Sequence, residues 1–238
     1  MNAVKGYIFD FGATLDTGGC HWGMMLWHAY QSMGMPVTEQ QFREAYVAAE
    51  RLLGREPLVH PHFTFRQTLS VKVNLEIKHL AGDATTALSL SDAPSLATAI
   101  VDNIYSEVQR HIAHSREVLQ QLSEPKVLVS NFYGNMATVL REFQLDKLFS
   151  RVIESAVVGV RKPDPRIFLL GADALGLTPG EVMVVGDSYE KDIIPAREVG
   201  CRTAWLRGEP WDDAPVDGRA ADMVITDLRE LITTSKNN

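Results

Sequence analysis

The stretch that decides the fold is Tyr7-Ile8-Phe9-Asp10-Phe11-Gly12-Ala13-Thr14-Leu15. Its first three residues are apolar and predict a short buried β-strand, and an acid follows directly at the strand's end. The glycine and alanine that come next predict a turn. In open α/β sheets, ligands bind at the carboxyl ends of the strands. Asp10 is therefore a candidate functional carboxylate.

Five further short apolar runs share this character, and helical patterns separate them along the chain. The predicted strands cover residues 126–129, 152–155, 182–185, 203–206 and 223–225, and the predicted helices cover 136–143, 166–175 and 193–199. Short β-branched runs that end in polar or glycine-containing turns are typical of a parallel sheet buried on both faces. Their alternation with helices predicts a doubly wound, Rossmann-like α/β sheet with right-handed crossovers.

Residues 18–113 interrupt this alternation with almost no strand signal and four plausible helices. Thr38-Glu39-Gln40-Gln41 is a capping box that begins a helix running towards Leu53. Apolar residues between 65 and 80 predict a second helix, and Asp92 is a predicted N-cap for a helix over 92–108. We therefore predict a core domain over 1–17 and 114–238, with an inserted all-helical cap over 18–113.

Composition narrows the class of protein. The chain has 238 residues, of which 45% are hydrophobic and 22% charged, and this is typical of a globular protein with one large core. Its net charge of −7 argues against nucleic acid as a partner, because phosphate backbones require a basic face. The first residues lack a signal-peptide pattern, and no apolar run approaches the roughly 20 residues that span a bilayer. We expect a cytoplasmic monomer or homodimer without a membrane partner.

The two cysteines, Cys20 and Cys201, lie far apart and show no zinc spacing. We expect both to be reduced thiols, as is usual in the cytoplasm.

A second polar strand end occurs in Val127-Leu128-Val129-Ser130-Asn131. The hydroxyl of Ser130 can donate to a phosphoryl oxygen, with backbone N–H groups nearby. The alternative is that Ser130 is an ordinary N-cap for the helix that follows.

A third motif is Gly159-Val160-Arg161-Lys162-Pro163-Asp164-Pro165. The prolines restrict the backbone around Lys162, which limits the mobility of its long cationic side chain. A lysine directed at the strand ends would neutralise charge on a nucleophile and on a transferring group. The alternative is a surface lysine in a turn.

A fourth motif is Val184-Val185-Gly186-Asp187-Ser188-Tyr189-Glu190-Lys191-Asp192. Here too a strand ends in an acid. Carboxylates of Asp10 and Asp187 can hold Mg²⁺, which prefers a few carboxylates together with water and substrate oxygens. Asp192 would bind the metal through water or orient Lys162, and the alternative is a solvated acid at a helix N-terminus.

The order of these four motifs resembles the haloacid dehalogenase (HAD) superfamily over essentially the whole chain, and the inserted segment resembles its helical cap type. The resemblance implies a nucleophile at Asp10 and charge neutralisation by Lys162. It implies that a small phosphorylated substrate is bound by Thr14, Ser130, Asn131 and Lys162. It also implies Mg²⁺ as cofactor, held by Asp10, the carbonyl of Gly12, Asp187 and Asp192.

Position 12 departs from the family's pattern. Most phosphatases of the superfamily read Asp-x-Asp-Gly-Thr, whereas this chain reads Asp10-Phe11-Gly12-Ala13-Thr14. The family's second aspartate protonates the leaving alkoxide and then activates water, and Gly12 can do neither. Positioned acid–base catalysis contributes on the order of 10²–10⁴-fold. Formation of an aspartyl-phosphate at Asp10 is thus better supported than its hydrolysis. The reaction rate should be reduced least for acyl or aryl phosphates.

Other residues are candidates to replace the missing acid–base group. Asp16 and His21 lie in the turn after the first strand, and histidine transfers protons well near neutral pH. The cap histidines His60 and His62 have a weaker claim, because they are predicted to lie in a loop.

The cap itself does not name a substrate. It offers few charged anchors, and aromatic residues at helical spacing are more typical of a cap core than of a substrate pocket. These aromatic residues are Trp22, Trp27, Tyr30, Phe63 and Phe65.

The favoured hypothesis is Mg²⁺-dependent phosphoryl transfer from a small phosphorylated metabolite. A haloacid dehalogenase-type carbon–halogen hydrolase also lacks the second aspartate, but Asp187 would place unhelpful negative charge beside Asp10. Phosphonate cleavage requires a cap lysine, and neither Lys72 nor Lys78 falls where the family places it. Gly12 motivates a third alternative, a catalytically impaired protein that binds a phosphorylated ligand or regulates.

Overall fold

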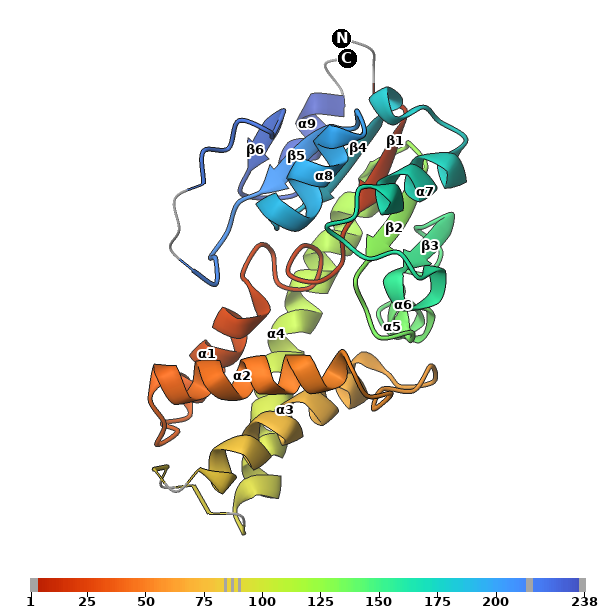
Figure 1. Cartoon of the computed structure of the whole chain (residues 1–238). Coiled ribbons are helices and arrows are strands. Elements are labelled where there is room, and N and C mark those ends of the chain that lie inside the picture. The colour runs from red at the N-terminus through yellow and green to blue at the C-terminus, as the bar shows by residue number, and fades with distance from the viewer. Residues whose placement is uncertain (1–3, 84, 87, 90, 213–215, 236–238) are drawn as a thin grey trace.

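The computed structural model describes residues 4–83, 85–86, 88–89, 91–212 and 216–235. At its centre lies a parallel sheet of six strands in the order β3-β2-β1-β4-β5-β6 (Figure 1). The strands are β1 (Gly6–Phe9), β2 (Lys126–Ser130), β3 (Arg151–Glu154), β4 (Val182–Gly186), β5 (Arg202–Leu206) and β6 (Met223–Ile225). All six predicted strands are confirmed to within one residue at each end.

Helices cover both faces of the sheet because alternate side chains of a strand point to opposite faces. Tyr7 and Phe9 belong to one buried cluster and Ile8 to another. The helices after β2 are α5 (Met136–Glu142), α6 (Ser155–Val158), α7 (Arg166–Leu175), α8 (Ile194–Glu198) and α9 (Glu230–Ser235), with short turns η1 (Pro179–Glu181) and η2 (Tyr189–Ile193). The predicted doubly wound α/β fold is confirmed.

Among the described residues between β1 and β2 there are four helices. They are α1 (Trp22–Ser32), α2 (Glu39–Leu53), α3 (Phe65–Gly82) and α4 (Ala93–Gln121). The predicted capping box begins α2, and Thr64 with Gln67 forms a second box at α3 that the sequence analysis missed. Asp92 precedes α4 as predicted, but its side chain makes no capping hydrogen bond. Its backbone is already helical rather than extended, so its carboxylate cannot cap the first turn.

The inserted helices lie beyond the carboxyl end of β1, and α4 runs from them back to the sheet (Figure 1). Its N-terminal half buries Ile100 and Ile104, and its C-terminal half buries Val118 and Leu119, all in one cluster that also holds Phe9. The inserted helices and the sheet therefore share a continuous core. In the part of the chain that the structure describes, no helix is long and apolar enough to cross a membrane.

Candidate active site

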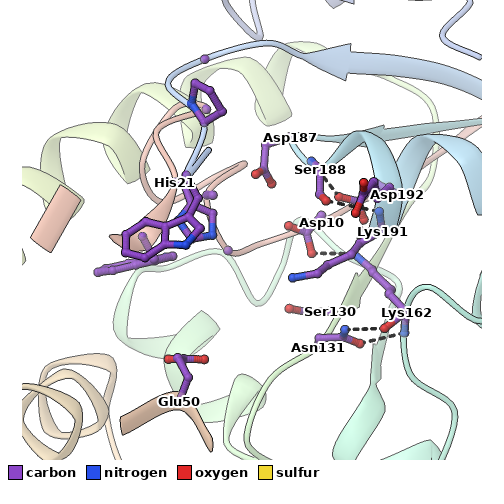
Figure 2. Close-up of a pocket in the computed structure, with 18 of the residues that line it drawn as sticks. Asp10, His21, Glu50, Ser130, Asn131, Lys162, Asp187, Ser188, Lys191 and Asp192 are labelled. Atoms are coloured by element: carbon purple, nitrogen blue, oxygen red, sulfur yellow. Dashed lines mark hydrogen bonds and ion pairs between the residues drawn. The ribbon is translucent and has the colours of Figure 1, made fainter. Parts of the chain in front are cut away.

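A cavity of about 500 Å³ lies between the carboxyl ends of the strands and the inserted helices. The sheet side of its wall includes Asp10, Ser130, Lys162, Asp187 and Asp192. Asp10 directly follows β1, and its N–H donates to the carbonyl of Val185 on β4 (2.9 Å). The predicted strand ends therefore meet at one edge, and Figure 2 shows their side chains converging there.

Lys162 is the buried cation of this edge. Its Nζ donates to Asp10 Oδ1 and to Asp192 Oδ1, both at 2.6 Å, and the residue is only 4% exposed. Burial alone would lower the pKa of Lys162, but the two carboxylates outweigh burial and raise it. The alternatives of a surface lysine and of a solvated Asp192 are therefore wrong.

Asn131 and Ser130 take different roles beside Lys162. The amide of Asn131 donates to the carbonyl of Lys162 and accepts from its N–H, both at 3.0 Å. This side chain, predicted to bind phosphate, is thus engaged in positioning the lysine. Ser130 lines the cavity at 2% exposure. It is not a helix cap, because Asn135 occupies the N-cap position of α5.

The hydroxyl of Thr14 lies within hydrogen-bond distance of two of the acids, Asp10 and Asp187. Its hydroxyl lies 3.2 Å from Asp10 Oδ2 and 3.0 Å from Asp187 Oδ1, and it accepts from the N–H of Asp187 (3.0 Å). Thr14 is fully buried and belongs to the support of the carboxylates rather than to the cavity wall. The sequence predicted it on the phosphate side.

Three carboxylates share this edge with one buried cation. Oxygen atoms of Asp10, Asp187 and Asp192 all lie within 4.8 Å of one another. Burial, then the charges of the other two acids, raise the pKa of Asp187 well above its ordinary range. Burial also raises the pKa of Asp192, to about 6, against the opposing effect of Lys162. A divalent cation would relieve this repulsion, and carboxylate oxygens suit Mg²⁺, so the residues fit that metal.

Gly186 allows Asp192 to approach. A Cβ at position 186 would lie 2.5 Å from Asp192 Cγ, which no side chain tolerates. The glycine before Asp187 is therefore required by packing.

Gly12 stands where the family has its acid–base aspartate, and the space that a side chain would occupy there is open. A Cβ built at this position would meet only the indole of Trp22, with Nε1 at 3.9 Å and Cδ1 at 4.0 Å. Asp16 lies behind that indole. It is fully buried and accepts hydrogen bonds from Ala13 N–H (2.7 Å) and Trp22 Nε1 (3.0 Å). Burial raises the pKa of Asp16 to about 8. Because Asp16 is outside the cavity wall, it does not reach a leaving group directly.

The candidate histidines differ in their access to the cavity. His21 lines the cavity, but its Nδ1 accepts from Gly23 N–H (3.0 Å). Burial and then Lys72 lower the pKa of His21 to about 4, so the neutral ring presents Nε2–H as a donor. His60 and His62 are exposed and lie outside the cavity wall.

The helical wall holds residues to which the sequence assigned no place in the site. Glu50 on α2 and Lys72 on α3 line the cavity and form an ion pair at 2.6 Å. Trp22, predicted to belong to the cap core, also faces the cavity. Trp211, in the loop after β5, completes the wall and packs against Gly23 of α1. No motif pointed to these residues, because their positions depend on how separate helices pack.

The polar groups at four strand ends of this parallel α/β sheet lie at the edge where open α/β sheets bind their ligands. The family model of haloacid dehalogenase-like hydrolases matches residues 4–200, and the chain belongs to this family of hydrolases. It is similar to the glyceraldehyde 3-phosphate phosphatase of Pyrococcus furiosus, with 36% identity over 37% of this chain and 38% of that protein.

It is also similar to the phosphoserine phosphatase of Thermus thermophilus, with 40% identity over 35% of this chain and 32% of that protein. The matched part thus spans less than half the length of these curated relatives. A solved dehalogenase with an intermediate complex covers 100% of both chains at a TM-score of 0.65 and 18% identity, which is a likeness of fold alone.

Proposed function

We propose that this hydrolase catalyses Mg²⁺-dependent phosphoryl transfer from a small phosphorylated metabolite, through an aspartyl-phosphate at Asp10. The observation that carries the proposal is the buried contact of Lys162 with Asp10, beside two further acids that fit a metal ion. The phosphatase names of the curated relatives support the same reaction class. Mg²⁺ would be held by Asp10, Asp187 and the carbonyl of Gly12, with Asp192 nearby, and would neutralise charge on the phosphoryl oxygens.

The first step uses the carboxylate of Asp10. One of its oxygens attacks phosphorus and forms a P–O bond, while the bond to the leaving oxygen breaks and its electron pair stays on that oxygen. Lys162 stabilises the negative charge, and the hydroxyl of Ser130 donates to a phosphoryl oxygen. Water then attacks phosphorus, the bond to Asp10 breaks, and phosphate leaves while the proton of water passes to solvent.

Gly12 sets the chemical preference of this reaction. No side chain at this position protonates the leaving oxygen or accepts the proton of water. Alkyl phosphates should therefore react on the order of 10²–10⁴-fold more slowly than with a positioned acid. Acyl and aryl phosphates should react better, because their leaving groups depart without protonation.

The test compares three compounds in parallel. The purified protein is incubated with Mg²⁺ and p-nitrophenyl phosphate, acetyl phosphate or 2-chloropropionate, and released phosphate, released chloride and phosphorylated protein are measured. We expect phosphoryl transfer from the first two, and Asp10→Asn should abolish it. Asp173→Asn, an exposed acid on α7, is the matched control and should leave it unchanged.

Two outcomes would overturn the proposal. Metal binding without any phosphoryl transfer would indicate a ligand-binding or regulatory protein. Chloride release that needs no metal would indicate the carbon–halogen hydrolase, which the three clustered carboxylates disfavour.

We also propose the division into a core (1–17 and 114–238) and a helical cap (18–113), because the cavity lies between these two parts. The single helix α4 crosses the boundary at 113 and 114, so it would act as the rigid connection. A cytoplasmic location and a monomeric or homodimeric state complete the proposal, and sedimentation analysis of the purified chain tests the latter.

A further inference from the structure

A cysteine, a histidine and a glutamate from three separate segments meet beside the cavity. Cys20 lies in the turn after β1, His28 lies on α1, and Glu209 lies in the loop after β5. His28 Nε2 is 3.1 Å from Glu209 Oε1, and Cys20 Sγ is 3.6 Å from Glu209 Oε2. One donor atom of each residue lies within 4.8 Å of the other two. The phosphoryl transfer proposed above uses none of these three residues.

The main chain brings the thiol and the carboxylate together. Gly19 precedes Cys20, Gly208 precedes Glu209, and a Cβ at Gly208 would lie only 2.3 Å from the carbonyl oxygen of Gly19. This approach is possible because glycine has no Cβ. In addition, the N–H of His21 donates to the carbonyl of Glu209 at 2.9 Å. The turn after β1 and the loop after β5 are therefore fixed to each other at this point.

Helix α1, which carries His28, packs on the same loop. The ring of Trp211, two residues after Glu209, lies against Gly23 of α1, where a Cβ would be 2.0 Å from the ring. All three segments that supply the cluster are therefore held in place by packing that does not involve the three side chains themselves.

The donor atoms of the cluster are one sulfur, one nitrogen and one oxygen. Zn²⁺ is bound in proteins by these three donor types, whereas Mg²⁺ takes oxygen ligands. In a tetrahedral zinc site, the usual bond lengths place neighbouring donor atoms about 3.4–3.6 Å apart. The distances of 3.1 and 3.6 Å in the cluster are close to these values. A thiolate and a carboxylate together would also balance both charges of the ion.

The cluster is accessible, and its carboxylate has no cationic side chain of lysine or arginine as partner. The side chains of His28 and Glu209 are 49% and 43% exposed, so an ion can reach them from solvent. Among the described residues, Arg161 and Lys191 line the same cavity but form no ion pair with Glu209. Arg43 reaches the loop after β5, but it donates to Asp212 and to the carbonyl of Trp211.

We propose that Cys20, His28 and Glu209 form a binding site for Zn²⁺, with water as the fourth ligand. Two of the ligands belong to the inserted segment 18–113, and the third belongs to the loop after β5. A bound ion would therefore cross-link α1 to that loop. Glu209 and Trp211 also line the cavity, so the cross-link would restrict the motion of one of its walls.

The test uses Co²⁺ as a spectroscopic substitute for Zn²⁺. Cobalt bound to a thiolate gives an intense near-ultraviolet absorption that carboxylate ligands do not give. The absorption therefore distinguishes this site from the carboxylates of Asp10, Asp187 and Asp192. The reduced full-length protein is titrated with Co²⁺ in excess Mg²⁺, and Zn²⁺ is then added. We expect one thiolate-bound Co²⁺ per chain and its displacement by Zn²⁺.

Three variants test the assigned ligands. Cys20→Ser should abolish the absorption, because it removes the sulfur donor. His28→Ala and Glu209→Gln should each weaken Zn²⁺ binding by about 100-fold, since even residues that only support zinc ligands contribute 10–100-fold. Both residues are exposed, so these two variants should fold normally.

Each variant has a control of the same residue type outside the cluster. Cys201→Ala removes the other thiol, which is buried in a different part of the core. His79→Gln and Glu190→Gln change an exposed histidine on α3 and another exposed acid of the cavity wall. All three controls should keep the cobalt absorption and bind Zn²⁺ within about twofold of the unmodified chain.

Hydrogen exchange tests the cross-link separately. With Zn²⁺ bound, exchange should slow in α1 and in residues 207–212, and Cys20→Ser should show no such slowing. Bound Zn²⁺ with unchanged exchange in both segments would contradict the cross-link.

Four further results would overturn the metal site. They are no cobalt–thiolate absorption, absorption that is lost in Cys201→Ala, unchanged Zn²⁺ affinity in Glu209→Gln, and binding that survives Cys20→Ser but is lost in Asp187→Asn. The last result would place the ion at the carboxylate edge. None of these results bears on the phosphoryl-transfer proposal, whose test uses other residues.

Discussion

Gly12→Asp should restore the missing acid–base group. The structure has room for the change, because a Cβ at this position would contact only Trp22, at ordinary distances of 3.9 and 4.0 Å. Gly12 is also not among the glycines with a positive φ angle, so an aspartate fits its backbone without strain. We therefore expect the variant to fold with nearly unchanged stability.

The expected gain depends on the leaving group. An aspartic acid that protonates a leaving alkoxide should speed its transfer by on the order of 10²–10⁴-fold, or about 3–5 kcal/mol of activation free energy. Acetyl phosphate expels acetate, which needs no proton. The rate of phosphoryl transfer from acetyl phosphate to Asp10 should therefore change little, although hydrolysis of the phosphorylated protein should become faster.

The assay therefore resolves single steps. Rapid-quench experiments measure phosphorylation of Asp10 by glycerol 3-phosphate and by acetyl phosphate, and then the loss of the phosphoryl group. Gly12→Asn is the control, because it has the same size and no carboxyl proton. A gain below about tenfold with the alkyl phosphate, or an equal gain in the asparagine variant, would refute the reasoning.

Three further variants test the supporting structure. Lys162→Met leaves the buried carboxylates of Asp10 and Asp192 without a cation, so urea denaturation should show a free energy of unfolding lower by about 3–5 kcal/mol. A loss of at most about 1 kcal/mol, as for a surface ion pair, would contradict the argument from burial. Asp16 has its pKa raised by burial from 3.8 to about 8, so its contribution to stability is fully present below about pH 4 and is lost as the pH rises towards 8. Asp16→Asn should remove up to about 1.4 kcal/mol per pH unit of that slope, and parallel stability curves would show that the group is not protonated in the folded state. Gly23→Ala places a Cβ 2.0 Å from the Trp211 ring and should cost about 1–3 kcal/mol and alter tryptophan fluorescence; unchanged emission and stability would mean that the ring does not rest on α1.

Much of the fold was predictable because its signals are local. Apolar runs of strand length alternate with helical patterns, and the central strands β1, β2 and β4 are buried on both faces, so all six strands were found. The capping box at Thr38 was likewise readable, since both partners lie within one helical turn. Asp92 shows the limit of such signals, because its residue type suits a cap but its backbone conformation does not.

The edge of the sheet was also predictable in outline. Acids and small polar groups that directly follow parallel strands must meet at one edge, and Asp10, Lys162 and Asp192 are indeed in contact there. The hydrogen bonds that assign Asn131 to Lys162 and Thr14 to the carboxylates were not predictable, because they depend on side-chain orientation.

The sequence by itself determined that this chain has a parallel α/β sheet, an inserted helical segment and a strand-end aspartate without its usual partner at position 12. Only the tertiary structure decided where the two nearby candidates for that role, Asp16 and His21, lie. Asp16 and His21 both lie close to position 12 in sequence. Packing buries Asp16, and Nδ1 of His21 accepts a hydrogen bond from the N–H of Gly23. It also decided the pairing of Glu50 with Lys72, because two residues on different helices meet only through the packing of α2 against α3.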